Sequence, residues 1–206
     1  MFLLEDLLKQ ENFTEAVNKL AYDFRKKHDL PPIDQLGLVV PDVESAAAQL
    51  EKMGIGPFFI MSGDVKKWVE RGESRRFYCK AGFASHCGLD LELLEPGEGS
   101  DFYGQHVDPD GRVVIHHLGF FVKNKDKEVA KLNAKGYSTW ISGIIQAGPA
   151  TFNIGYMDTL SEIGMLIEII EFKMFGIRFR PPGSIYHLLG WLEKKCGVRS
   201  VNVHKK

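Results

Sequence analysis

Four polar side chains stand at matched positions of two similar halves of this chain, and their types suit metal binding. The run IDQLGLVV, which contains Gln35, is similar to the run IHHLGFFV, which contains His117. Further along, GLDLELLEP contains Glu92 and is similar to GMLIEIIEF, which contains Glu168. Each of the four interrupts an apolar, strand-like run, where an unpaired carboxylate would cost several kcal/mol. We therefore expect the four groups to converge on one point.

The chemistry of this set indicates which ions it would hold. One imidazole nitrogen and three oxygen donors, with no sulfur, suit a divalent ion of borderline or hard character, such as Zn, Ni, Co, Mn or Fe. Such a set leaves coordination positions open for water or a substrate. The identity of the ion does not follow from the residues.

Each of these residues also has an ordinary structural interpretation. Gln35 taken alone is more typical of a polar residue at a strand edge, whereas Glu92 and Glu168 are favoured as ligands over solvated strand carboxylates. Side chains alternate faces along a strand, so only one of the adjacent His116 and His117 can face the site. The register of the repeat selects His117, and we expect His116 to be a hydrogen-bonded packing residue on the helix side.

Other chemically capable residues are assigned to structure. Glu95 and Glu171 recur in step, but they fall at strand ends and are interpreted as surface acids. No spacing supports a reactive pair at His86 and Cys87. Residues 64–78 mix five basic residues with Trp and two other aromatic residues. That segment could clamp phosphates, but a solvated hairpin is the favoured interpretation.

The elements that must position these residues form a repeated β-α-β-β-β pattern, as expected when internal similarity recurs at a fixed offset. In the first copy, a helix starts at the capping residue Asp42 and ends at Gly54, and in the second a helix ends at Gly136. Strands are predicted near 33–40, 57–62, 76–83 and 88–95, and near 115–122, 137–144, 149–156 and 164–171. We therefore predict an α+β fold in which two βαβββ modules form a cup-shaped, curved mixed sheet with extra terminal helices.

The predicted boundaries follow from these patterns. They are N-terminal accessory helices at 1–32, a first module at 33–96, a connecting loop at 97–114, a second module at 115–172, and a C-terminal helix with a basic tail at 173–206. In the first segment, residues 12–28 have helical apolar spacing, with Asn12 as cap. The C-terminal helix is expected to have Ser184 as its cap and to place Ile185, Leu188, Leu189, Leu192 and Cys196 on one face.

Composition limits the classes of partner and compartment. The 206 residues are 44% hydrophobic and carry a net charge of −1, which argues against nucleic acid or an anionic membrane as the main partner. Three widely spaced cysteines form no thiolate zinc pattern and indicate a reduced, cytoplasmic protein. The N-terminus lacks the pattern of a signal peptide, and no run reaches the length of a membrane span.

At these residues the chain resembles the vicinal oxygen chelate superfamily, which includes glyoxalases, bleomycin-resistance proteins and extradiol dioxygenases. The resemblance covers roughly residues 33–172, and the stretches LELLEPGEGSDFY and IHHLGFFV look most like the branch that holds methylmalonyl-CoA epimerase. It implies the paired-module fold and metal ligands at Gln35, Glu92, His117 and Glu168, and we expect the protein to be a homodimer. The epimerases usually have histidine in place of Gln35 and often glutamine in place of Glu92. The set found here is instead similar to that of eukaryotic glyoxalase I.

Three classes of function are compatible with this resemblance. The favoured class is a metal-dependent isomerase, epimerase or lyase, in which an enediolate forms next to a carbonyl and Glu168 is the base. Its leading substrates are acyl-CoA or other small carboxylated thioesters. The second class is a non-catalytic protein that binds and sequesters a small molecule. The third is an iron-dependent ring-cleaving dioxygenase. Its iron site requires two histidines and one carboxylate, and Gln35 stands where one of the histidines is needed.

Overall fold

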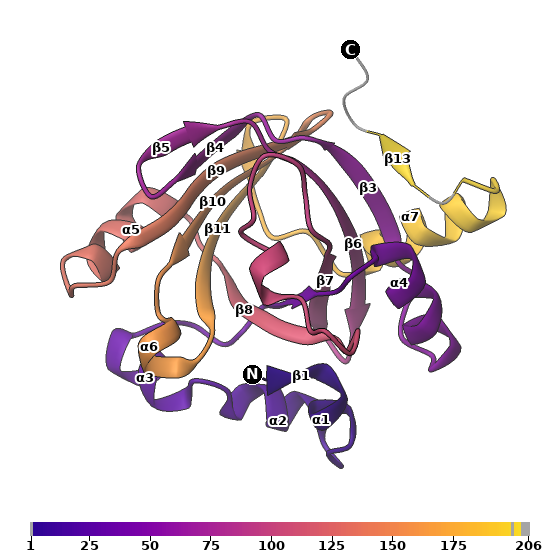
Figure 1. Ribbon diagram of the computed structural model, residues 1–206, viewed down its shortest axis with the longest axis horizontal. Helices are drawn as coiled ribbons and strands as arrows, with labels where there is room; N and C mark the ends of the chain where they lie inside the picture. Colours follow the sequence, from indigo (N-terminus) through magenta and orange to yellow (C-terminus); the bar gives the residue numbers. More distant parts are fainter. Residues whose placement is uncertain (1, 199, 203–206) are drawn as a thin grey trace.

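The computed structural model describes residues 2–198 and 200–202, and its main feature is one strongly curled sheet (Figure 1). Across the sheet the strands are β13 (Val201–Asn202), β3 (Phe59–Asp64), β6 (Tyr78–His86), β7 (Leu89–Leu94), β2 (Gln35–Val39), β8 (Val114–Phe121), β11 (Leu166–Met174), β10 (Ala150–Met157), β9 (Thr139–Ala147), β4 (Lys67–Glu70) and β5 (Glu73–Arg75). In addition, β1 (Phe2–Leu3) pairs with β8, and β12 (Ile177–Arg178) pairs with β11. The α+β cup of two βαβββ modules is confirmed.

The two modules meet at the centre of the sheet. There β2 and β8, the first strands of the two modules, pair antiparallel. Each also pairs in parallel with the last strand of its own module, β2 with β7 and β8 with β11. The four strands that carry the repeated polar residues are therefore neighbours.

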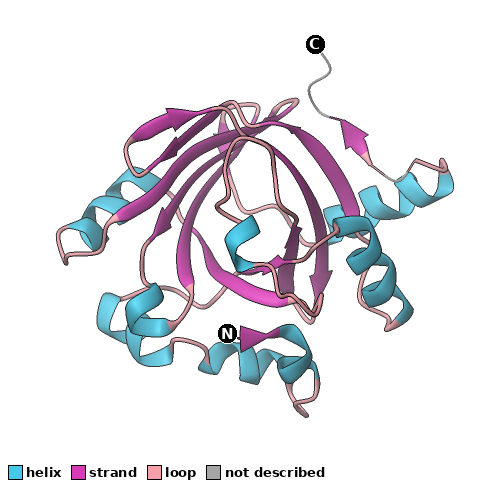
Figure 2. Ribbon diagram, viewed as in Figure 1, coloured by secondary structure: helices cyan, strands magenta, loops and turns pink. Residues whose placement is uncertain are grey.

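Helices cover the outer face of the curled sheet, as Figure 2 shows. The module helices are α4 (Val43–Lys52) and α5 (Lys125–Asn133). Their N-caps are Asp42 and Asn124, whose side chains accept hydrogen bonds from the backbone N–H groups of Ser45 and Lys127. Both helices are followed by a glycine with positive φ, 84° at Gly54 and 95° at Gly136, as predicted. Their apolar faces pack on outward-facing strand residues such as Leu36 and Leu91 in one core cluster.

Glu95 and Glu171 are not surface acids, contrary to the prediction. Oε2 of Glu95 accepts a hydrogen bond from the backbone N–H of Val43 at 2.8 Å, and Oε2 of Glu171 accepts one from that of Lys125 at 3.1 Å. Each carboxylate therefore satisfies a free N–H at the start of its module's helix. The two glutamates occupy equivalent positions of the repeat because, in both modules, a glutamate from the end of the last strand holds the N-terminus of the module's helix.

The segment 64–78 departs most from the expected plan. It leaves β3, forms the hairpin β4–β5, and adds that hairpin to the far edge of the sheet, where β4 pairs with β9 of the second module. Its basic side chains Arg75 and Arg76 are exposed, but Trp68 and Phe77 are buried, with ring centroids 4.4 Å apart. The segment is therefore a strap across the cup and not a solvated hairpin.

The terminal segments form the remaining elements. At the N-terminus lie α1 (Leu4–Leu8), α2 (Phe13–Lys19) and α3 (Tyr22–His28), so the single helix expected over 12–28 is wrong. It is interrupted at Ala21, whose φ of 48° is left-handed, although the Asn12 cap is present. The short elements η1 (Gly104–His106) and α6 (Leu160–Ile163) were not predicted.

The C-terminal helix α7 (Ser184–Lys195) packs on β3 and β6 with a face that adjoins the predicted one, of which Ile185 and Leu189 are only partly buried. Its buried residues are Tyr186, Gly190 and Glu193, whereas Leu188 is 55% exposed. Ser184 is the first residue of the helix and not its cap as predicted, because Gly183 holds the cap position, where no side chain makes a capping hydrogen bond. Within the described part of the chain, none of the helices has the length and apolar content that crossing a bilayer requires.

Candidate metal centre and its pocket

Strand register brings the four predicted ligand residues to the centre of the cup. On β7, Glu92 lies opposite Gly37 of β2, which in turn lies opposite His117 of β8. The second half repeats the arrangement: on β8, Gly119 lies between Gln35 of β2 and Glu168 of β11. Side chains at these paired positions share one face of the sheet.

The two glycines make room for the polar side chains. A Cβ atom at Gly37 would lie 1.8 Å from Cε1 of His117, and one at Gly119 would lie 2.8 Å from Oε1 of Gln35. Real Cβ atoms do not approach other atoms so closely, so each glycine provides space through which a neighbouring side chain reaches the centre. The matched glycines of the repeat are therefore part of the site.

Three of the predicted ligands form a tight, buried group. Nε2 of His117 lies 3.4 Å from Oε2 of Glu92 and 3.0 Å from Oε2 of Glu168. The three ligand atoms all lie within 4.8 Å of one another, and His117 is 0% exposed. Gln35 is buried as well and lines the same pocket as the two glutamates, and its Oε1 has no hydrogen-bond partner among the described residues.

The electrostatics of this group favour a positive charge. Burial by itself lowers the pKa of His117, but the carboxylates of Glu168 and Glu92 outweigh it and raise the pKa to about 9. Burial raises the pKa of Glu92, and the nearby Glu168 adds to this, whereas His117 opposes it. Without a cation, the two glutamates thus hold a proton on the histidine.

His116 is hydrogen-bonded, as predicted, but it does not lie on the helix side. The register between β2 and β8 shifts at this point, pairing Gly37 with His117 and Leu38 with Ile115, so His116 is the extra residue of a bulge. Its Nδ1 lies 3.0 Å from Nδ1 of His117, and its ring packs against Phe102. Burial, with His117 and His106 adding to it, holds the pKa of His116 well below its usual range.

This contact determines which nitrogen of His117 faces the site. Because His116 occupies Nδ1 of His117, only Nε2 is directed to Glu92 and Glu168. Histidine ligands of metals are commonly oriented by a second hydrogen bond of this kind. Behind the ring, Tyr103 and Tyr156 share a buried hydrogen bond of 3.1 Å between their hydroxyls, and the rings of Tyr156 and His117 lie 5.0 Å apart.

The donor set fits a divalent metal ion. The three mutually close atoms are one imidazole nitrogen and two carboxylate oxygens, and the amide oxygen of Gln35 is available in the same pocket. A cation there would also compensate two buried carboxylates that otherwise share a single positive partner. Glu92, His117 and Glu168 are thus the residues able to hold the ion, with Gln35 as the fourth candidate.

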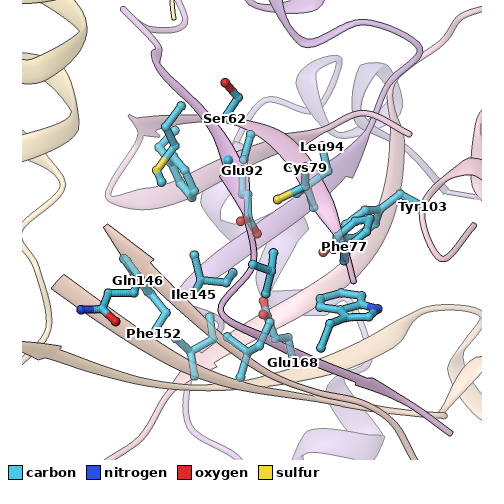
Figure 3. Close-up of a pocket in the computed structure, with 18 of the residues that line it drawn as sticks. Ser62, Phe77, Cys79, Glu92, Leu94, Tyr103, Ile145, Gln146, Phe152 and Glu168 are labelled. Atoms are coloured by element: carbon cyan, nitrogen blue, oxygen red, sulfur yellow. The ribbon is translucent and has the colours of Figure 1, made fainter. Parts of the chain in front are cut away.

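A pocket opens beside this group, with about 770 Å³ of space that includes the part open to solvent. Figure 3 shows the carboxylates of Glu92 and Glu168 directed into it, with Phe77 and Tyr103 on one side and Ile145 and Phe152 on the other.

Sequence reasoning missed several residues that shape this pocket. Trp68 and Phe77 line it from the strap that crosses the cup, and Tyr103 lines it from the connection between the modules. Two sequence features could have indicated these residues: the cluster of aromatic residues between 64 and 78, and the aromatic pair at 102–103. Large aromatic side chains in a predicted loop are usually buried. His86 and Cys87 lie outside the pocket, and Cys87 is exposed.

Comparisons with known proteins agree with this architecture. The family model of the glyoxalase/bleomycin resistance protein/dioxygenase superfamily matches residues 34–156. A variant of the Streptomyces coelicolor methylmalonyl-CoA epimerase in complex with 2-nitronate-propionyl-CoA is 19% identical, with 68% of this chain and 94% of that chain covered and a TM-score of 0.44. The Mycobacterium tuberculosis methylmalonyl-CoA epimerase is 18% identical, with 67% and 85% covered and a TM-score of 0.42.

A hypothetical protein from Bacillus halodurans C-125 is similar at the same level, with 17% identity, 67% of this chain and 91% of that chain covered, and a TM-score of 0.43. No curated protein matches the chain. The family match extends over more than half of the sequence and includes Gln35, Glu92 and His117. The chain therefore belongs to the glyoxalase/bleomycin resistance protein/dioxygenase superfamily.

Proposed function

We propose that this protein is a metal-dependent isomerase or epimerase that moves a proton on a carbon next to a carbonyl group. The observation that supports this most is the buried group of Glu92, His117 and Glu168 at the junction of the two modules, beside a largely apolar pocket. Buried carboxylates without function are rare because each needs compensation. A substrate carbonyl that enters the pocket would reach these residues at the inner end of the pocket.

Each residue has a distinct proposed role. Nε2 of His117 and the carboxylates of Glu92 and Glu168 would hold the ion, with Oε1 of Gln35 as a further oxygen ligand. A bound divalent ion would polarise the substrate carbonyl and stabilise negative charge on its oxygen. His116 keeps Nε2 of His117 directed at the site by occupying Nδ1.

Glu168 is the proposed base, by its position in the family pattern. Its carboxylate takes the proton from the carbon next to the carbonyl, and the C–H electron pair becomes a C=C bond while the carbonyl π pair moves to oxygen. Return of the proton to the carbon, from the same or the opposite face, restores the carbonyl and completes exchange or inversion. The lining of the pocket is largely apolar, which would limit competing protonation of the enolate by water.

The matched positions of Glu92 and Glu168 provide an internal control for this assignment. Both Glu92→Gln and Glu168→Gln should weaken metal binding, since each removes a charged ligand. With excess metal supplied, Glu92→Gln should retain proton exchange, whereas Glu168→Gln should lose at least about 100-fold, the usual contribution of a general base. The measurement is deuterium uptake from heavy water at the α-carbon of acyl-CoA thioesters, followed by mass spectrometry.

A second candidate function is sequestration of a small molecule without chemistry, which the largely apolar pocket would also suit. Tight binding of a ligand in the pocket, together with no deuterium uptake across a broad panel of carbonyl compounds, would favour this function. Retention of full exchange by Glu168→Gln would remove Glu168 from the mechanism.

A further inference from the structure

The charges that line the pocket all have the same sign. They belong to Glu92 and Glu168 at the inner end and to Asp64, and no lysine or arginine is among the described residues that line the pocket. Arg76 pairs with Asp64 at 2.8 Å, but both side chains are largely exposed, so this pair lies at the rim. The interior therefore offers an anionic substituent no cationic side chain.

An ion at the centre does not change this balance. A divalent cation held by the carboxylates of Glu92 and Glu168 gives a neutral assembly, because neutral His117 and Gln35 add no charge. A carboxylate elsewhere in the pocket would be buried without a partner, which costs several kcal/mol.

The remaining wall is suited to a group without charge. Apolar side chains come from the strap and from both modules, and they include Val65, Trp68, Phe77, Ile145, Phe152 and Ile154. Trp68 and Phe77 are held in place by their mutual contact, and Ile154 by the core. Burying an aliphatic or aromatic group here yields about 25 cal/mol for each Å² removed from water.

We infer that the part of the acyl group that extends from the metal centre into this pocket is uncharged and apolar, branched-aliphatic or aromatic in type, and that acyl groups with a carboxylate too remote to reach the ion are excluded. This inference rests on the proposed function for the position of the carbonyl at the metal centre. It limits the carboxylated thioesters expected from the sequence resemblance to those whose carboxylate can bind the ion itself.

The experiment compares two thioesters of the same shape, 5-methylhexanoyl-CoA and glutaryl-CoA, in which an isopropyl end replaces a carboxylate. Binding to the zinc-loaded protein is measured by calorimetry, and deuterium uptake at the α-carbon by mass spectrometry. The uncharged thioester should bind at least about tenfold more tightly, since a difference of about 1.4 kcal/mol is already tenfold. Equal or tighter binding of glutaryl-CoA, or no binding of either thioester, overturns the inference.

A charge placed in the wall should reverse the preference. Ile145→Lys adds an ammonium group to the pocket at a partly buried position and should improve glutaryl-CoA binding relative to 5-methylhexanoyl-CoA by at least about tenfold. Ile144→Lys is the matched control, because Ile144 is also partly buried but lines an outer-face depression with Lys125. A reversal by Ile144→Lys and not by Ile145→Lys would contradict the proposed location.

The two measurements separate this inference from the proposed function. If the uncharged thioester binds preferentially but neither compound exchanges deuterium, the proton-transfer function fails while the pocket's selectivity stands. If glutaryl-CoA exchanges as fast as the uncharged thioester, the function stands and the selectivity fails.

Discussion

At the scale of single residues, the atoms that would bind a metal also bind protons. Nε2 of His117 is shared between Glu92 and Glu168 at 3.4 and 3.0 Å, so a proton there occupies the place that an ion would take. Metal binding and titration of this histidine are therefore linked, because a histidine must be neutral to serve as a ligand.

Metal affinity should consequently rise with pH between 7 and 9. Burial opposes the charged form of His117, but Glu168 and Glu92 raise its pKa to about 9, so an ion displaces a proton throughout this range. One displaced proton makes the affinity increase about tenfold for each pH unit. Competition with a chelator at pH 7, 8 and 9 measures this, and an affinity independent of pH would contradict the proton-sharing arrangement.

A second residue-scale prediction concerns Asp90, which is 2% exposed on the same face of β7 as Glu92. Burial raises its pKa to about 6, which Arg180 opposes and Asp34 reinforces. The folded state thus binds this proton more tightly than the unfolded state, so the free energy of unfolding falls as pH rises from about 4 to 6.

Asp90→Asn should remove the decrease in the free energy of unfolding that accompanies ionisation of Asp90. Its free energy of unfolding should exceed that of the unmodified protein at pH 7 by up to about 3 kcal/mol and differ little at pH 4. Urea denaturation at the two pH values is the measurement, and Asp126→Asn at an exposed position is the control. An equal effect at both pH values would show that titration of Asp90 is not the cause.

Most of the site could be predicted from residues alone because the repeat relates Glu92 to Glu168 and Gln35 to His117. The position of His116 could not, because alternation assumes a regular strand. The ladder bulges where Gly37 meets His117, and a bulge depends on the packing of both strands, which local sequence does not encode. His116 therefore supports its neighbour instead of facing the helices.

At the scale of elements, each module fixes its helix to its last strand through one glutamate. Glu95 accepts from Val43 N–H and Glu171 from Lys125 N–H, at 2.8 and 3.1 Å. Glu95→Ala and Glu171→Ala should each lower the free energy of unfolding by about 1–2 kcal/mol, the effect of losing a helix N-terminal acceptor. The double variant should show the sum, because the helices belong to separate modules.

Chemical denaturation of the three variants provides the measurement. Glu73→Ala is the control, since its side chain is 76% exposed on β5, and it should change stability by less than about 0.5 kcal/mol. Losses no larger than that of the control would mean that water replaces these carboxylates at the helix ends.

The positions of the module helices α4 and α5 were predictable from apolar spacing and caps, but the orientation of α7 was not. At Gly190 the helix lies against the backbone just before β3, where an added Cβ would lie 2.8 Å from the carbonyl carbon of Phe58. The helix therefore packs through backbone contact on its glycine and tyrosine side, leaving Leu188 and Trp191 exposed. Hydrophobic periodicity identifies the stripe of apolar side chains on a helix. A contact made by a glycine adds nothing to that pattern, so the pattern could not indicate this face.

At the scale of the whole molecule, the strap joins the two modules a second time, away from the β2–β8 junction (Figure 1). Trp68 anchors it between Phe77 and Phe102, with ring centroids 4.4 and 5.7 Å away. Trp68→Ala should lower the free energy of unfolding by about 3–5 kcal/mol, as expected for a buried tryptophan. It should also weaken binding of the apolar thioester, because Trp68 lines the pocket.

Trp191→Ala is the matched control, since this tryptophan is 46% exposed on α7 and should contribute little. Thermal or urea denaturation of both variants tests the prediction, and similar losses would remove the strap as a structural anchor. The strap could not be predicted because its pairing partner, β9, lies far along the chain. Local patterns indicate a hairpin but carry no information about which edge receives it.

The strap also determines the order in which the molecule can be completed during synthesis. The ribosome releases the first module before β9 exists, so β4 and β5 have no edge to join at that stage. Trp68 and Phe77, buried in the finished protein, then remain uncovered, and the nascent half is vulnerable to aggregation. Although the two halves derive their architecture from one pattern, the first cannot mature ahead of the second. We expect the first half expressed alone to be insoluble, and co-expression with the second half to rescue it.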